Sequence, residues 1–363
     1  MYREIGSWFW IKPGELQQGT CNEMDISQYG YNGSDYAWFS TGRSATAYVL
    51  DTIESRNPQA SKVAVLPPFT CHTVIEPFLD RGYQIHTYHV DRDLMAEASD
   101  LLQIVEEQQA SVILFHRYFG FDTIKDLDGV VPQLQRKGVV IIEDCTQCLY
   151  SNFKKSAADY LVASIRKWCG VPDGGFAICK DGSFVNKPSL IDRNLQKAKI
   201  EASILKYEYL VEGKGDKRVF LTKYREAEDI LDTQKEFFSI SDISKAILLN
   251  LNIQQLKTKR RENFETIAKG LSDAKNIKVI FNVLTGDDVP LFCPVLCEDR
   301  YTIQTVLVEN NIFAPVVWPK ADSCPQVDET TDYIYEHILC IPIDQRYGTD
   351  DMERVVSVIK SIK

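Results

Sequence analysis

Apolar runs alternate with amphipathic segments through the first half of the chain. Runs of strand length occur at residues 62–69, 83–90, 111–120 and 139–144. Segments with the helical period, at 42–56, 71–82, 94–108 and 127–138, precede or separate them. This alternation predicts the α/β class, with a mostly parallel central sheet flanked by helices. Such sheets bind ligands beyond the carboxyl ends of their strands, so the residues that directly follow the apolar runs are the candidates for function.

The pattern changes in the second half of the chain. A polar helical stretch at 185–235 contains a charged loop with two glycines, and residues 239–271 predict one long helix. Ser239 and Asp242 resemble a capping box at its start. The remaining apolar runs predict a smaller α+β domain. The predicted domains are a large α/β domain at 1–238 and a small one, with the long helix, at 239–363.

Composition narrows the class of partner. The 363 residues are 44% hydrophobic and carry a formal net charge of −10, with a sequence pI near 5.2. This acidity argues against nucleic acid or an anionic membrane surface as the main partner. The first residues lack a basic region followed by an apolar run, and no apolar segment reaches the roughly 18 residues of a membrane span. We therefore expect a cytoplasmic protein.

The ten cysteines fit this location as reduced thiols. Cys145 and Cys148 form a CxxC pair, and Cys293 and Cys297 a CxxxC pair, so zinc is the alternative interpretation. Both pairs lie in or beside apolar, strand-like runs, whereas structural zinc pairs usually lie on tight turns. The sequence therefore predicts no metal site.

Two strand ends carry residues suited to chemistry. Asp144 ends the run at 139–144, and a buried carboxylate needs a partner, either an arginine or a protonated ring nitrogen of a cofactor. Lys167 follows a second apolar strand, and Ser164 lies three residues before it. A partly desolvated lysine has a lowered pKa and attacks aldehydes, whereas a lysine at a strand end is otherwise a surface charge.

A third candidate is the turn that opens the first helix, at Thr41, Gly42, Arg43 and Ser44. Free N–H groups at a helix start bind anions, although any N-cap has this pattern. A phosphate cradle, a strand-end aspartate and a strand-end SxxK are, in this chain order, the parts of a pyridoxal-phosphate (PLP) site.

The chain resembles the DegT/StrS-type sugar aminotransferases, a family of fold-type I PLP enzymes, over nearly its whole length. The order and spacing of short motifs carry the resemblance, and the last glycine pair begins seven residues after Lys167. The matching segments are TGRSA at 41–45, VAVLPPFTCHT at 63–73, ILFHRYFG at 113–120, IIEDCTQC at 141–148 and DGGFAI at 173–178.

The resemblance implies roles for individual residues. Lys167 is the Schiff-base lysine that also moves the proton, and Asp144 holds the pyridinium nitrogen. Gln147 donates to the phenolic oxygen of the ring, and Thr146 lies on one ring face. On the other face the family's aromatic residue falls at Cys71, and the neighbouring His72 is our choice, because imidazole stacks and a thiol does not. The phosphate contacts are expected from Gly42, Arg43, Ser44 and Ser164.

Two departures mark a divergent member. Ser164 and Lys167 enclose two residues, where the family usually has more between its serine and lysine. The family's N-x-R-M stretch, whose asparagine reaches the phosphate of a neighbouring chain, is replaced here by FFSISD at 237–242. The sequence therefore does not predict whether a neighbouring chain contacts the phosphate, or whether the family's usual nucleotide-sugar pocket is present.

The resemblance implies transfer of an amino group from an amino acid, with glutamate as the first choice, to a keto-sugar or sugar-nucleotide-like acceptor. It also implies a homodimer. Three alternatives stay open: other PLP chemistry on a sugar-like substrate, a non-catalytic regulator that binds PLP or a sugar, and an α/β binding protein without a cofactor. Dehydratases of the family have histidine in place of the lysine, and Lys167 argues against them.

Overall fold

A computed structural model describes residues 4–17, 24–152 and 157–362. The chain forms two compact units, and the division between them falls within one helix, α1 (Gly42–Arg56), and within one strand, β9 (Tyr160–Ser164). Unit 1 contains Met1–Ser7, Ile53–Leu161 and Ile253–Lys363, and unit 2 contains Trp8–Thr52 and Val162–Asn252.

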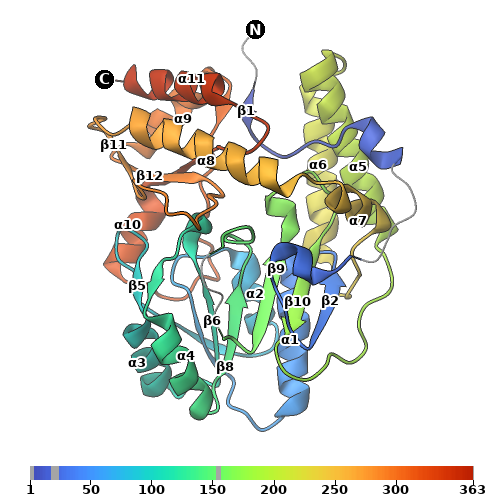
Figure 1. Ribbon diagram of the computed structural model, residues 1–363, viewed down its shortest axis with the longest axis vertical. Helices are drawn as coiled ribbons and strands as arrows, with labels where there is room; N and C mark the ends of the chain where they lie inside the picture. Colours follow the sequence, from blue (N-terminus) through green and yellow to red (C-terminus); the bar gives the residue numbers. More distant parts are fainter. Residues whose placement is uncertain (1–3, 18–23, 153–156, 363) are drawn as a thin grey trace. The chain divides into compact units, whose positions relative to one another are not determined.

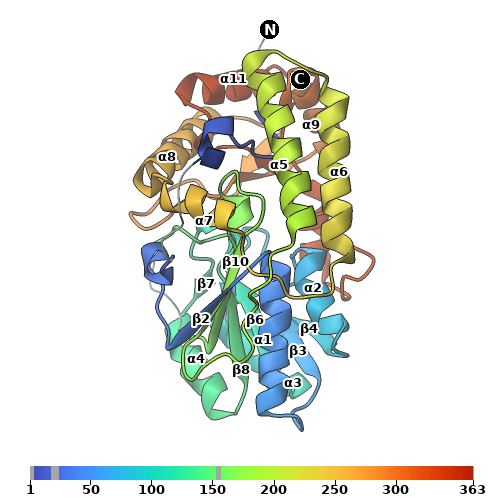
Figure 2. The ribbon, with the colours of Figure 1, turned by 90° about the vertical axis from the view of Figure 1, so that its right-hand side faces the viewer.

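Unit 1 holds four parallel strands in the order β8-β6-β3-β4. Each is an apolar run that the sequence predicts as a strand, and β6 and β3 are buried almost throughout, as expected for parallel strands covered on both faces. Helices α2, α3 and α4 connect these strands and pack on them (Figures 1 and 2). The bounds are β3 (Val63–Leu66), α2 (His72–Leu79), β4 (Gln84–Thr87), α3 (Ala98–Gln108), β6 (Val112–His116), α4 (Leu127–Arg136) and β8 (Val140–Asp144).

The C-terminal part of unit 1 has an antiparallel sheet in the order β11-β12-β14, packed against helices. Its elements are α8 (Ile253–Gly270), β11 (Ile277–Val279), β12 (Cys293–Cys297), α9 (Arg300–Glu309), α10 (Glu329–His337), β14 (Ile338–Ile341) and α11 (Thr349–Lys360). Two short parallel pairs complete the unit: β1 (Ile5–Gly6) with β13 (Ile312–Phe313), and β5 (Ala96–Glu97) with β7 (Ile124–Lys125).

In unit 2, β2 (Asp35–Phe39) pairs antiparallel with β10 (Gly175–Cys179), and β9 lies next to β10. The polar stretch of the sequence forms a helical hairpin, α5 (Arg193–Tyr207) and α6 (Lys217–Thr233), whose helices lie side by side in both views (Figures 1 and 2). A π-helical turn at Glu208–Glu212 ends α5, and Gly213 follows it with a φ of 68°, a conformation that glycine adopts without strain. The glycines of the loop therefore make the turn.

The predicted α/β class with a mostly parallel sheet is confirmed. The single long helix at 239–271 is wrong, because α7 (Asp242–Leu249) ends before α8 begins at Ile253. Asn250 terminates α7, and its side-chain amide donates to the carbonyl of Ala246. The N-cap of α7 is Ser241, which accepts from the backbone N–H of Ser244, and not Ser239. The predicted domain boundary at 238/239 stays a prediction.

Within the described ranges, no helix is long and apolar enough to cross a membrane.

A buried ion pair lies at the carboxyl ends of β6 and β8. The Arg117 guanidinium donates to the Glu143 carboxylate over 2.7 Å, and its Nε lies 2.8 Å from Asp122. Glu143 is fully buried. Burial by itself lowers the pKa of Arg117, but Glu143, Cys148, Asp122 and Cys145 outweigh it, so the pKa is raised. The arginine therefore stays charged and compensates the buried glutamate.

We expect Arg117→Met to lower the free energy of unfolding by about 3–5 kcal/mol, because it leaves Glu143 as a buried charge without its partner. The double variant Arg117→Met/Glu143→Gln should recover a large part of this loss. Urea unfolding followed by circular dichroism measures both. A single variant as stable as the wild type, or a double variant no more stable than the single one, would contradict the prediction.

Candidate functional site

The predicted aspartate ends a parallel strand of unit 1. In the β6–β8 register, His116 pairs with Asp144, the last residue of β8. Asp144 is buried, and its Oδ1 accepts from the backbone N–H of Thr146 over 2.8 Å. This bond fixes the carboxylate at the start of the turn that follows the strand, where a parallel sheet exposes its ligand edge.

The same turn carries Gln147, whose two amide atoms have different surroundings. Its Oε1 accepts from the backbone N–H of Phe119 over 3.0 Å. Its Nε2 is buried and has no hydrogen-bond partner among the residues that the structure describes. A buried donor without a partner is costly, so its position needs an explanation. An acceptor on a bound group supplies one, and the phenolic oxygen of PLP has the required chemistry.

Sequence reasoning missed Phe119, which holds Gln147 in this orientation. Phe119 is fully buried, and its φ of 54° lies in the left-handed region, which is uncommon for an aromatic residue. The backbone N–H points at Gln147 only because the chain bends here. A positive φ at a non-glycine residue gives no signal in the sequence.

His72 and Cys71 lie at the start of α2. Cys71 is the N-cap, and its Sγ accepts from the Thr73 hydroxyl over 3.1 Å. The His72 side chain is 46% exposed, and its Nε2 lies 4.0 Å from Glu76. The side chain of His72 is thus accessible, as stacking on a cofactor requires. Which of the two residues lies on a ring face stays a prediction.

In unit 2, Ser164 is the last residue of β9 and is buried, and Lys167 ends the short helical turn Ile165–Lys167. Lys167 is exposed, so its amino group is accessible. An ideal Cβ at Gly42 would lie 2.9 Å from the Ser164 Cβ, closer than real side chains approach. Glycine at this position therefore lets the start of α1 lie against the end of β9, and the structure brings together Gly42 and Ser164 as expected.

The other residues of this turn have structural partners. Ser44 donates its backbone N–H to the Thr41 hydroxyl over 3.0 Å, and the two hydroxyl oxygens are 2.8 Å apart. Arg43 donates to the carbonyl of Leu231 and lies 3.6 Å from Asp232, both on α6. In this structure Arg43 thus holds α6, and the phosphate contacts predicted for Arg43 and Ser44 stay predictions.

A second residue that sequence reasoning left without a role is Asp173, directly before the glycine pair. It is buried, and its Oδ1 accepts from the Ser241 backbone N–H over 3.0 Å and from the Ser244 hydroxyl over 2.6 Å. Its other oxygen has no hydrogen-bond partner within the described part of the chain. Burial raises the pKa of Asp173, although these bonds and Arg166 oppose it. The aspartate ties the loop after Lys167 to the start of α7.

One cluster has the composition of a metal site. The ligand atoms of Glu143, Cys145 and Cys148 lie within 4.8 Å of one another, and all three residues are buried. Arg117 already supplies a cation to Glu143, and a metal ion would add charge next to it. The expectation of no metal stays a prediction.

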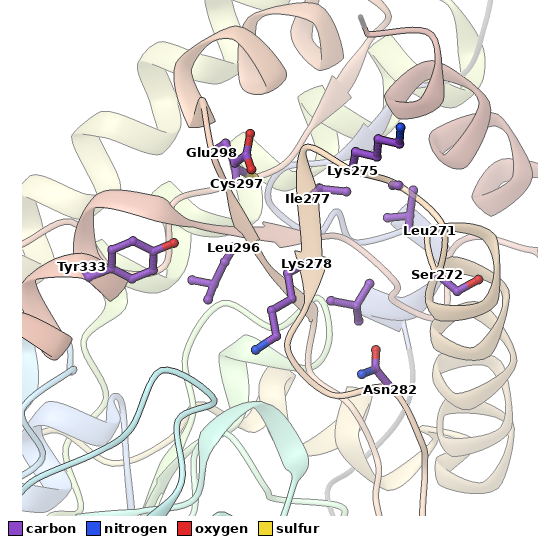
Figure 3. Close-up of a pocket in the computed structure, with 12 residues that line it drawn as sticks. Leu271, Ser272, Lys275, Ile277, Lys278, Asn282, Leu296, Cys297, Glu298 and Tyr333 are labelled. Carbon is purple, nitrogen blue, oxygen red and sulfur yellow. The ribbon is translucent and has the colours of Figure 1, made fainter.

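A pocket opens between β11, β12 and α10 in unit 1, away from the predicted residues (Figure 3). Tyr333 at one side stacks on His337 at 3.9 Å, and Lys278 at another pairs with Asp93 at 2.5 Å. These contacts occupy the Tyr333 ring and the Lys278 amino group. The labelled lining residues are Leu271, Ser272, Lys275, Ile277, Lys278, Asn282, Leu296, Cys297, Glu298 and Tyr333.

No family model matches the chain, and no curated protein matches it in sequence. Solved structures match nearly its whole length. PseC of Helicobacter pylori, an aminotransferase involved in the biosynthesis of pseudoaminic acid, is 13% identical with a TM-score of 0.70 and covers 99% of this chain and 98% of its own. A DegT DnrJ EryC1 StrS aminotransferase from Brucella abortus is 15% identical, with a TM-score of 0.65 and coverage of 97% and 91%. The sugar aminotransferase CalS13 from Micromonospora echinospora is 19% identical, with a TM-score of 0.64 and coverage of 90% and 87%. The resemblance seen in the motifs is thus confirmed for the fold.

His116 gives a pH prediction for the strand-end region. Burial lowers the pKa of His116 from 6.5 to about 3, although the hydrogen bond between Nε2 and the Phe69 carbonyl acts in the opposite direction. The folded state binds this proton less well than the unfolded state. The contribution of neutral His116 to the free energy of unfolding is therefore complete above pH ~6.5 and is lost as the pH drops toward ~3. Between about pH 7.5 and pH 5 this amounts to about 2 kcal/mol.

We expect His116→Gln to remove this part of the pH dependence, measured as the difference in urea unfolding free energy at the two pH values. His72→Gln, at an exposed histidine, should leave the difference as in the wild type. A His116→Gln protein with the wild-type pH dependence would show that His116 is protonated near its ordinary pKa.

Proposed function

We propose that this chain is a PLP-dependent aminotransferase of the DegT/StrS type. It moves an amino group from an amino acid, with glutamate as the first donor to test, to a keto-sugar or sugar-nucleotide-like acceptor. The observation that carries the proposal is the strand-end turn of unit 1. There, the Asp144 carboxylate accepts a hydrogen bond from the backbone N–H of Thr146. Gln147 accepts from Phe119 through Oε1, and its Nε2 is a buried donor without a partner among the described residues.

In unit 1, each residue of the turn has a definite task toward PLP. The cofactor supplies an electron sink through its protonated ring. The Asp144 carboxylate keeps the proton on the ring nitrogen, because an opposite charge favours the charged form. Gln147 donates to the phenolic oxygen from Nε2. Thr146 would contact one ring face, and the imidazole of His72 would contact the other.

In unit 2, Lys167 would hold the cofactor through its accessible amino group, and the same amino group would serve as the base and acid that moves the substrate proton. Gly42, Arg43, Ser44 and Ser164 are assigned to the phosphate. The close approach at Gly42 supports this assignment, because it keeps the backbone N–H groups at the start of α1 uncovered by a side chain. Arg43 would have to leave its contacts with α6 to take part.

The comparisons support the class of reaction. PseC and CalS13 are described as aminotransferases, one in pseudoaminic acid biosynthesis and one acting on sugars, and a putative sugar aminotransferase from Streptococcus pneumoniae is described in its PLP form. Fold alone does not settle a substrate, so the sugar-like acceptor rests on this likeness together with the motifs. A homodimer and a cytoplasmic location belong to the proposal for the same reason.

The first test is an absorbance spectrum of the purified protein with added PLP. We expect a visible band from lysine-bound cofactor, its loss in Lys167→Ala, and its bleaching by glutamate. A wild type without the band would overturn the cofactor assignment. A band that no amino acid bleaches would overturn amino transfer and favour a PLP-binding regulator.

A second test addresses Gln147. Gln147→Leu removes the buried donor, so the Kd for PLP should rise about tenfold, which corresponds to one hydrogen bond. Gln103→Leu is the matched control, because Gln103 is on the exposed face of α3 and bonds to Glu107. Titration of the absorbance band measures the Kd values. Equal Kd values for the wild type and Gln147→Leu would show that Nε2 does not contact the cofactor.

A further inference from the structure

The backbone at Phe119, which orients Gln147, has a conformation that an aromatic residue rarely adopts. Its φ is 54° and its ψ is 20°, inside the left-handed region, and the residue is fully buried. Such a conformation costs on the order of 1–3 kcal/mol and persists only where the surrounding structure holds it. The contacts that hold Phe119 therefore also decide where the Gln147 amide points.

Contacts from three segments of unit 1 reach Phe119. Its N–H donates to the Gln147 Oε1 over 3.0 Å, and its carbonyl accepts from the backbone N–H of Leu291 over 2.9 Å. Its ring stacks on the ring of Trp318, with the centroids 6.4 Å apart and 22° between the planes. Leu291 and Trp318 belong to the C-terminal part of the unit, so that part takes a share in holding the bend.

Trp318 also contacts the strand ends beside the bend. Its indole stacks on His116 at 5.7 Å, with 23° between the planes, and His116 is the β6 residue that pairs with Asp144. The ring of Phe69, which follows β3, lies 5.4 Å from the Trp318 ring. One side chain thus touches the ends of β3 and β6 and the bend at Phe119.

Trp318 differs in exposure from the aromatic residues that it contacts. Phe69, His116 and Phe119 are buried, whereas Trp318 is half-buried. Truncation of a half-buried ring leaves a smaller cavity than truncation of a buried one, and the cost to stability falls with the cavity. A variant at Trp318 is therefore a suitable test of the hold on Phe119.

We propose that Trp318 is a positioning residue for the turn that contains Gln147. Its stacked ring keeps Phe119 in the left-handed conformation, so that the Phe119 N–H occupies the Gln147 Oε1 and the Nε2 is left to donate to a bound group. This inference rests on the proposed function in one respect, because it takes PLP to be that bound group. The hold on the Phe119 backbone concerns the protein alone.

A tryptophan that only filled space would act differently. Its loss would lower the free energy of unfolding and raise hydrogen exchange broadly in the unit, without a particular effect on Phe119. A positioning residue acts first on Phe119, through the stacked ring, and its effect on PLP passes through Gln147.

Hydrogen exchange of the apo protein tests the hold on the backbone. In Trp318→Ala, the exchange of the Phe119 amide should accelerate at least about tenfold more than that of the β6 amides, because the backbone is released from the left-handed region. Trp318→Phe keeps a stacking ring and should exchange as the wild type does. Tyr333→Ala is the matched control, since it removes another half-buried ring of unit 1, which stacks on His337. Mass spectrometry with electron-transfer fragmentation resolves single amides.

A double-mutant cycle tests the path to the cofactor. Trp318→Ala should raise the Kd for PLP about three- to tenfold, up to the loss expected for Gln147→Leu. In the Gln147→Leu background the same substitution should leave the Kd unaltered, because the amide through which it acts is gone. Titration of the visible band gives the four Kd values.

A selective acceleration at Phe119, with an effect on Kd that disappears in the Gln147→Leu background, establishes the proposal. An acceleration no greater at Phe119 than in β6, or equal effects on Kd in both backgrounds, overturns it and makes Trp318 a space-filling residue. Failure of the proposed function has a different signature. In that case neither the wild type nor any variant forms the visible band, while the exchange result still decides the hold on Phe119.

Discussion

The candidate site in unit 1 depends on the parallel register of β6 and β8. This pairing places His116 opposite Asp144, so both strands end at the same level of the sheet. The segments that follow the two strands therefore leave the sheet side by side. The backbone N–H of Phe119, after β6, donates to the Gln147 side chain in the turn after β8 and orients it. Beneath them, Arg117 and Glu143 neutralise each other in a fully buried position. A shift of the register by one residue would turn the side chains of β8, Glu143 and Asp144 among them, to the opposite face of the sheet.

In unit 2 the constraint is steric, because backbone segments lie too close together for a side chain between them. Gly42 lies against Ser164, and an ideal Cβ at Gly175 would lie 2.5 Å from the Thr41 backbone carbon. Two glycines thus let three backbone segments approach where β9, β10 and the start of α1 come together. A side chain at either glycine would force these segments apart. The phosphate contacts of Gly42, Arg43, Ser44 and Ser164 stay a prediction, and Arg43 has other partners in this structure.

The sequence predicted the elements well where local rules decide. The alternation of apolar runs and helical segments identified the strands of unit 1, and the helix at 42–56 has the bounds of α1. It failed where local and tertiary effects compete: residues 250–252 have no proline or glycine, yet the helix breaks there at the division between the units. The motifs located Asp144, Gln147 and Lys167 at turns and strand ends. They could not locate Phe119 or Asp173, because a positive φ and a buried carboxylate are products of packing.

Low identity with full coverage has a physical meaning for this chain. Identities of 13–19% at TM-scores of 0.64–0.70 indicate that the backbone arrangement persists while most side chains differ. Residues that act by touching a cofactor are constrained in type and spacing, so short motifs survive and can be recognised.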